Sequence, residues 1–406
     1  MKALMKWMHF AWLNALRNKR RSAVTLAIAA LGTAGLLLAG GFALFTYESL
    51  AQSSARSTGH LVLGTPAQFS QDEDVPLQHG LDDWQALRTQ VLLEPEVRQV
   101  LPRVEFTGLI SNGEKSTVMV ANGIDADAEF AVKGPFLQVK SGEVIMSRER
   151  LVVMLGEGLA KSLKAEPGSS LTLLASTTAG ALNAVDVTVR GVVSTGIAEM
   201  DKRLVYVDLP SAQALLATDR VSTLGVFLKD MPSTAPLQQR LQAAHGSLKV
   251  KTWLDLATFY RAVRDLYNRI FGALGLIIAL IVLFVVANAM AMAIIERTRE
   301  IGTLRALGTT PRQLLTALSL EGLVLGGGGA LLGALLAFGI SVLLLVVPVN
   351  MPPPPGSNKG YPLNIAIDGS LYAWTLLAML VLTGLSAAFV ARRTVHQPVV
   401  EALAHV

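Results

Sequence analysis

Four long apolar stretches divide the chain. They cover residues 23–47, 270–295, 320–347 and 371–390, and Glu321 is the only Asp, Glu, Lys or Arg in any of them. A hydrocarbon core of about 30 Å needs about 20 helical residues, because each residue adds about 1.5 Å. Each stretch is therefore predicted to be a transmembrane helix. The first stretch is predicted to remain in the mature protein as a span. It is longer than the apolar region of a signal peptide, which has about 7–15 residues, and no clear cleavage site follows it.

A short charged segment, residues 296–308, connects the second and third stretches. Its charges alternate in sign, while Ile301, Leu304 and Leu307 recur at every third position and form one apolar stripe. Gly308 can adopt the left-handed conformation that ends a helix, and Thr310 precedes a proline as an N-cap would. The sequence thus predicts a helix, a sharp corner and a new helix, which is the form of a docking element.

The roughly 220 residues between the first two spans are long enough for one or two folded modules. Alternating strand-like runs at 115–120, 185–190 and 204–207 mix with helical patterns at 82–92, 156–163 and 211–216. An α+β domain is therefore predicted, and the pattern does not give its strand order. Residues 51–58 and 254–269 contain no proline or glycine and are expected to form a helical stalk.

Basic residues are placed asymmetrically about the spans. Positive charge collects before the first span, between the second and third, and after the fourth, at these residues: Lys2, Lys6, Arg17, Lys19, Arg20, Arg21, Arg297, Arg299, Arg305, Arg312, Arg392 and Arg393. The positive-inside rule then places both termini and the 296–312 connection in the cytoplasm. The pI of about 9.4 reflects this orientation and does not indicate nucleic-acid binding.

The predicted organisation is as follows: cytoplasmic amphipathic N-terminus 1–22, span 23–47, extracytoplasmic α+β domain with stalk 48–269, span 270–295, cytoplasmic connection 296–312, span 313–347, proline-rich external loop 348–370, span 371–391 and cytoplasmic C-terminus 392–406.

The external loop contains four consecutive prolines, Pro352, Pro353, Pro354 and Pro355, which require extended backbone. This loop could lie at a substrate entrance or simply join two spans, and the sequence favours neither.

The third span is rich in glycine. Gly322, Gly326, Gly329 and Gly333 are spaced so that a neighbouring helix could approach closely, although tolerated flexibility explains them equally well. Glu321 lies near the cytoplasmic end of this span. We expect it to be an interfacial carboxylate rather than a buried ligand of a partner helix.

Motifs for chemistry are missing from the sequence. There is no G-x-x-x-x-G-K-[ST] phosphate loop, no histidine pair at metal-ligand spacing and no G-x-S-x-G nucleophile motif. The chain is therefore expected to bind no metal or cofactor and to have no enzymatic activity of its own, so any ATP chemistry belongs to another polypeptide. The absence of charge near mid-membrane also disfavours an ion-coupled carrier or a channel.

Several segments resemble the FtsX-like ABC permeases, the group that includes MacB and the lipoprotein-releasing LolC and LolE. The resemblance lies in residues 296–308, 311–313 and 321–322, with 17–22 and 398–403 at the ends, and it covers essentially the whole chain. Residues 59–64, 123–125, 155–160 and 191–196 are similar to the LolC/LolE branch.

The resemblance implies one permease subunit of a mechanotransmission transporter in the bacterial inner membrane. It implies a homo- or heterodimer with two copies of a cytoplasmic ABC ATPase that carries ATP and Mg, together with membrane lipid and a periplasmic lipoprotein carrier or adaptor. Residues 296–308 would be the coupling helix, with these contact residues: Glu296, Arg297, Arg299, Glu300, Ile301, Gly302, Leu304, Arg305, Leu307 and Gly308. The expected function is extraction or export of a lipoprotein or other amphiphile. The alternatives are activation of a periplasmic cell-wall hydrolase, as for FtsX, and MacB-like efflux with an adaptor.

Overall fold

The structure is a computed structural model that describes residues 19–70, 75–133, 138–146, 148–351 and 361–395. Contacts divide the chain into two compact units. One contains residues 1–47, 263–349 and 362–406, and the other contains residues 48–262 and 350–361. We call them the helical unit and the external unit and describe each by itself. Residues 1–18 of the predicted N-terminus 1–22, residues 396–406 of the predicted C-terminus 392–406 and the four prolines 352–355 lie outside the described residues.

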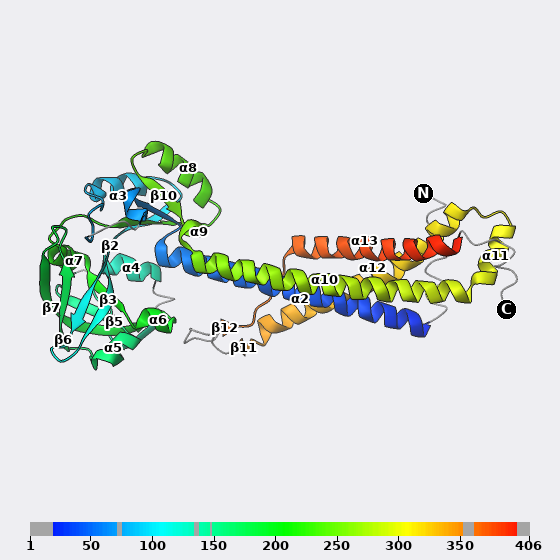
Figure 1. Cartoon of the computed structure of the whole chain (residues 1–406), viewed down its shortest axis with the longest axis horizontal. Helices are drawn as coiled ribbons and strands as arrows, with labels where there is room; N and C mark the ends of the chain where they lie inside the picture. Colours follow the sequence, from blue (N-terminus) through cyan, green and yellow to red (C-terminus); the bar gives the residue numbers. More distant parts are fainter. Residues whose placement is uncertain (1–18, 71–74, 134–137, 147, 352–360, 396–406) are drawn as a thin grey trace. The chain divides into compact units, whose positions relative to one another are not determined.

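Long helices dominate the helical unit (Figure 1). They are α2 (Lys19–Thr58), α10 (Thr258–Glu296), α12 (Pro311–Val346) and α13 (Gly369–Val395), with the short α11 (Thr298–Ala306) between α10 and α12. Among the described residues, these four long helices are the ones apolar enough to cross a membrane. They extend past the predicted spans at one or both ends.

Glycines allow α12 to pack closely on two neighbours. A Cβ at Gly322 would lie 2.3 Å from the Ala387 Cβ of α13, and one at Gly326 would lie 2.3 Å from Thr383 Cγ2 of the same helix. One turn further along, a Cβ at Gly329 would lie 2.6 Å from the Ala29 Cβ of α2. At Gly333 it would lie 2.3 Å from the Ala30 carbonyl oxygen of α2. All four glycines thus lie at close helix–helix contacts, the first two with α13 and the others with α2.

Replacing Gly333 with alanine is expected to destabilise the helical unit by about 1–3 kcal/mol, because the added methyl group meets backbone that cannot rotate away. Gly339 provides a matched control on the same helix, since a Cβ there has nothing within 4 Å. Gly339→Ala should be neutral or stabilising by up to about 1 kcal/mol, as alanine favours helix. Unfolding of the purified variants in detergent micelles measures both. Equal effects of the two substitutions would contradict this packing account.

A segment before α13 packs on α2. The Ala366 amide donates to the Gly41 carbonyl oxygen at 3.0 Å, and a Cβ at Gly41 would lie 2.6 Å from the Ala366 oxygen. Leu363 N donates to Val349 O at 2.8 Å, beside the short strands β11 (Asn350–Met351) and β12 (Tyr361–Pro362). The described part of the 348–370 connection is therefore hydrogen-bonded to structured neighbours.

The external unit is an α+β fold built on one sheet, as predicted. Among the described residues the sheet has ten strands: β1 (Leu61–Gly64), β2 (Val97–Ser111), β3 (Ser116–Ile124), β4 (Gln138–Gly142), β5 (Val152–Gly156), β6 (Ser170–Ser176), β7 (Leu182–Ser194), β8 (Leu204–Asp208), β9 (Thr223–Leu228) and β10 (Lys249–Thr252). The order is β10-β1-β9-β2-β3-β8-β5-β7-β4, and β6 pairs with both β2 and β7. Strands β2, β3, β8, β5, β7 and β6 consequently close into a ring around buried apolar side chains.

Short helices cover this sheet, namely η1 (Ala67–Phe69), α3 (Trp84–Leu92), α4 (Ala126–Lys133), α5 (Glu157–Leu163), α6 (Ala198–Asp201), α7 (Leu209–Leu216), α8 (Thr234–Ala244) and α9 (Trp253–Leu256). The predicted strands 185–190 and 204–207 fall within β7 and β8, and 115–120 overlaps β3 except for its first residue. The predicted helices match α3, α5 and α7 to within two residues at their starts and end where those helices end. Asp208 illustrates why α7 starts where it does: its carboxylate accepts from the Ser211 amide at 3.0 Å, and proline follows at the first turn.

The two helices that flank the external unit lead into neighbouring strands. α2 ends at Thr58 and β1 begins at Leu61, while β10 ends at Thr252, directly opposite Leu61 in the antiparallel pair. Residues 51–58 are continuous helix, as predicted for the stalk. The second stalk prediction, 254–269, is wrong in one respect: Ala257 lies outside both α9 and α10 and has non-helical dihedral angles. The Thr252–Asp255 capping box forms α9 as a separate turn before α10 begins.

Candidate functional site

The site predicted from sequence is the corner between α10 and α12. α10 ends at Glu296, and Arg297 has φ −114° and ψ 13°, so the helix breaks there and restarts at Thr298. The Thr298 hydroxyl donates to the carbonyl oxygens of Ile294 and Ile295 at 3.1 and 3.0 Å. The segment from 296 is therefore not the single predicted helix. Glu296 is the last residue of α10, Arg297 is the break, and the separate helix α11 begins at Thr298.

The end of α11 agrees with its sequence signals. Gly308 has φ +97° and donates to Arg305 O at 3.0 Å, and the Thr309 amide donates to Leu304 O at 3.0 Å. These two bonds form a Schellman motif, which requires the left-handed glycine. Thr310 then caps α12 through a capping box with Gln313, and Pro311 is its first residue. The predicted helix end, corner and N-cap are confirmed.

Arg297 and Glu321 form an ion pair inside the helical unit. Arg297 Nη1 lies 3.2 Å from Glu321 Oε2 and 3.3 Å from Oε1, and the side chains are 11% and 5% exposed. The expectation that Glu321 is an interfacial carboxylate is therefore wrong. The break at Arg297 allows its side chain to reach the first half of α12 instead of facing outward. The pair opposes opening of the corner, because separating the two side chains would leave a buried charge without its partner.

Burial sorts the other predicted contact residues into two faces. Ile301 and Gly302 are buried, and Ile301 packs with Leu314 and Leu318 of α12. They are therefore not available to a partner, which corrects their assignment to the docking surface. The exposed face consists of Glu296, Arg299, Glu300, Leu304, Leu307 and Gly308, with Arg305 half-buried. Leu307 is 78% exposed and Leu304 is 36% exposed. The apolar stripe is thus divided, with one residue in the core and two at the surface.

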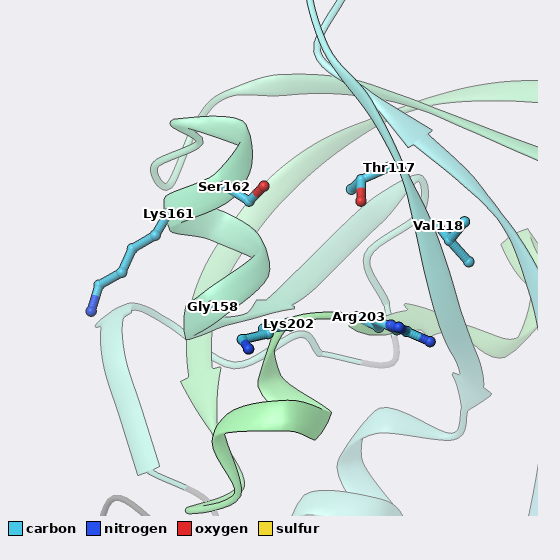
Figure 2. A pocket seen from close by; sticks show the side chains of 7 residues that line it. All are labelled: Thr117, Val118, Gly158, Lys161, Ser162, Lys202 and Arg203. Atoms are coloured by element: carbon cyan, nitrogen blue, oxygen red, sulfur yellow. The ribbon is translucent and has the colours of Figure 1, made fainter. Parts of the chain in front are cut away.

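The external unit contains a basic groove of about 680 Å³ between β3 and α5 (Figure 2). It is lined by Thr117, Val118, Gly158, Lys161, Ser162, Lys202 and Arg203, and the Thr117 and Ser162 side chains extend into it from opposite sides. Sequence reasoning did not find this groove.

The two lysines that line the groove already hold carboxylates. A hydrogen bond from Lys161 lowers the pKa of Glu157, and one from Lys202 lowers the pKa of Glu199. The positive charge of the groove is therefore partly compensated within α5 and α6, and its geometry indicates no particular ligand.

Within the described residues there is no cluster of three or more metal-ligating side chains. The corner, by contrast, combines a buried ion pair with an exposed face that carries both charged and apolar side chains. A helical unit with four candidate spans, an α+β unit inserted after the first, and such a corner indicate a multi-pass membrane protein.

Two family models match the chain. Residues 22–244 match the MacB-like periplasmic core domain, which is more than half of the chain, and residues 272–399 match the FtsX-like permease C-terminal family. The chain therefore belongs to the FtsX-like permeases that carry a MacB-like periplasmic core domain.

Named relatives are similar over part of their length. The lipoprotein-releasing system transmembrane protein LolE of Haemophilus influenzae is 28% identical over 62% of this chain and 62% of its own. LolC of Neisseria meningitidis is 28% identical over 57% of this chain and 54% of its own. The crystal structure of the periplasmic region of MacB from Actinobacillus actinomycetemcomitans matches 51% of this chain and 95% of its own at 16% identity, with a TM-score of 0.37. The chain thus aligns with less than two thirds of these LolE and LolC relatives.

Proposed function

We propose that the protein is a permease subunit of an ABC transporter in a bacterial inner membrane. Hydrolysis of ATP, with Mg, by a separate cytoplasmic ATPase would drive movement of its external unit. The proposal is supported chiefly by the corner at α11, because the chain belongs to a permease family and the corner exposes both apolar and charged side chains to a possible partner. Two ATPase copies and a second permease subunit, identical or different, complete the proposed assembly.

The docking contact that we propose is the exposed face of α11. Leu304 and Leu307 supply apolar contact, while Arg299 and Glu300 orient the partner through charge. Exposed ion pairs contribute only about 0.2–1 kcal/mol each, so the two leucines would supply more of the affinity. The buried ion pair between Arg297 and Glu321 would hold α11 in place relative to α12 while the ATPase is bound.

The proposed cargo is a lipoprotein or another amphiphile taken from the outer leaflet of the membrane. The lipoprotein-releasing relatives support this choice, and a periplasmic carrier or adaptor would receive the cargo. The test is reconstitution of the permease and its ATPase with a fluorescent lipoprotein in proteoliposomes, with a carrier added outside. Release that requires ATP hydrolysis is expected. ATPase turnover without release would favour the alternatives, activation of a cell-wall hydrolase or efflux through an adaptor.

The proposed topology places the external unit in the periplasm and both chain ends in the cytoplasm. An epitope inserted at Ser233, in the turn before α8, should be reached by antibody in spheroplasts without permeabilising them. An epitope between Gly308 and Thr309 serves as the control and should require permeabilisation. Labelling in the opposite pattern would overturn the orientation and, with it, the docking of a cytoplasmic ATPase on α11.

A further inference from the structure

A buried arginine in the external unit holds the end of α2. Arg103 lies in β2, between β9 and β3, and its side chain is 6% exposed. Its Nη1 donates to the carbonyl oxygen of Thr58, the last residue of α2, at 3.0 Å. Because the last carbonyls of a helix lack intrahelical partners and carry partial negative charge, a guanidinium is well suited to this position.

The same guanidinium is fixed by two further groups. Glu129 of α4, whose side chain is 1% exposed, accepts from Nη2 at 2.9 Å and from Nε at 3.4 Å. The Phe227 ring of β9 lies 5.7 Å from the guanidinium carbon. The planar fork of arginine satisfies these partners together, which the single ammonium group of lysine cannot do.

The backbone around Thr58 fits against the sheet without intervening side chains. Gly59 has φ +107° and donates to Ala55 O at 2.8 Å, which closes the helix. A Cβ at Gly225 of β9 would lie 2.8 Å from Thr58 O. Glycine at 225 therefore permits the end of α2 to lie directly on the strand beside Arg103.

The other connecting helix is joined to the sheet through a break, across which Arg261 Nη2 donates to Asp255 O at 3.2 Å and the Trp253 and Tyr260 rings pack 5.1 Å apart. Between β10 and α10 the chain forms the separate turn α9 and leaves the helical conformation at Ala257. The two connections are thus different in kind, since α2 is hydrogen-bonded into the sheet while the link to α10 contains a break.

We propose that Arg103 is the positioning residue through which displacement of α2 is transmitted to the external sheet. The clamp consists of Arg103, Glu129 and the Thr58 carbonyl. The break at Ala257 would allow α10 to change its direction when α2 moves the sheet. The proposal rests on the proposed function, in which ATPase movement reaches the external unit through the spans.

The test replaces the charged part of the clamp with apolar side chains of similar size. Arg103→Met with Glu129→Met removes both charges together, which buried sites tolerate far better than loss of one. Arg103→Lys, which keeps the charge, is a second variant. The control is Arg240→Met, which removes a half-exposed arginine that pairs with Glu94 and Glu96 away from α2.

Two readouts separate transmission from simple stability. Hydrogen exchange at residues 55–60 of the full chain in nanodiscs should accelerate at least tenfold in the double variant and be unchanged in Arg240→Met. In proteoliposomes, the double variant should keep ATPase turnover and lose most ATP-dependent release, and Arg103→Lys should fall between. If the wild-type protein releases cargo in an ATP-dependent way and the double variant releases it equally well, Arg103 does not transmit the displacement of α2. No ATP-dependent release in the wild type would instead overturn the proposed function, and the exchange result would still decide whether Arg103 holds α2.

Discussion

Replacing Glu321 with alanine is expected to lower the free energy of unfolding by about 3–5 kcal/mol, the range for removing one partner of a buried ion pair. Arg297 would stay in the interior, 11% exposed, without the carboxylate that faces it at 3.2 Å. The measurement is denaturant unfolding of the purified chain in mild detergent, followed by loss of helical circular dichroism.

Arg299→Ala is the control for the Glu321 prediction, because Arg299 is exposed two residues from Arg297. It should change stability by less than about 0.5 kcal/mol. Exchanging the charges, with Arg297→Glu and Glu321→Arg in one chain, should recover part of the loss. If Glu321→Ala were as mild as Arg299→Ala, the ion pair would not hold the corner.

Replacing Leu304 and Leu307 with aspartate is expected to weaken binding of the partner ATPase at least about 30-fold, since two apolar anchors at about 1 kcal/mol or more each would be lost. Both side chains are exposed, so the permease itself should fold normally. Affinity of the purified ATPase for nanodisc-embedded permease gives the measurement. Leu93→Asp, at an 81% exposed leucine of the external unit, controls for the general effect of the substitution.

A further outcome distinguishes the two faces of α11. Arg297 is on the internal face, so charge reversal there tests the ion pair and not the docking contact. Glu300→Arg, on the exposed face, should weaken ATPase binding only a few-fold, because exposed ion pairs contribute little to affinity. Unchanged ATPase binding by the Leu304 and Leu307 variant would place the docking contact elsewhere.

Local signals in the sequence were sufficient for much of the helical unit. Uninterrupted apolar runs predict the spans, and Gly308 with Thr310 and Pro311 predicts the corner, because both depend on residues close in sequence. The α+β class of the external unit also followed from alternation and turn residues.

Contacts between residues far apart in the sequence could not be predicted from local patterns. Arg297 and Glu321 are 24 positions apart, and they become neighbours because the chain turns back at the α11 corner. The threefold spacing of Ile301, Leu304 and Leu307 correctly indicates an amphipathic helix, yet it cannot tell which residues face the core. The Arg103 clamp joins positions 58, 103 and 129, which the sheet order brings together. That order depends on pairing across more than a hundred residues, and no local signal encodes it.

We propose that ATP binding to a partner docked on α11 moves the external unit relative to the spans. Because the chain has no cysteine, Gly246→Cys and Gly339→Cys introduce two unique spin-label sites, both in open space and one in each unit. Electron–electron double resonance in nanodiscs then measures the distance between them with the ATPase present. We expect a shift in this distance when ATP is trapped, and no shift when Leu304 and Leu307 are replaced by aspartate. An unchanged distance in the otherwise wild-type protein, or the same shift in the aspartate variant, would contradict the proposal.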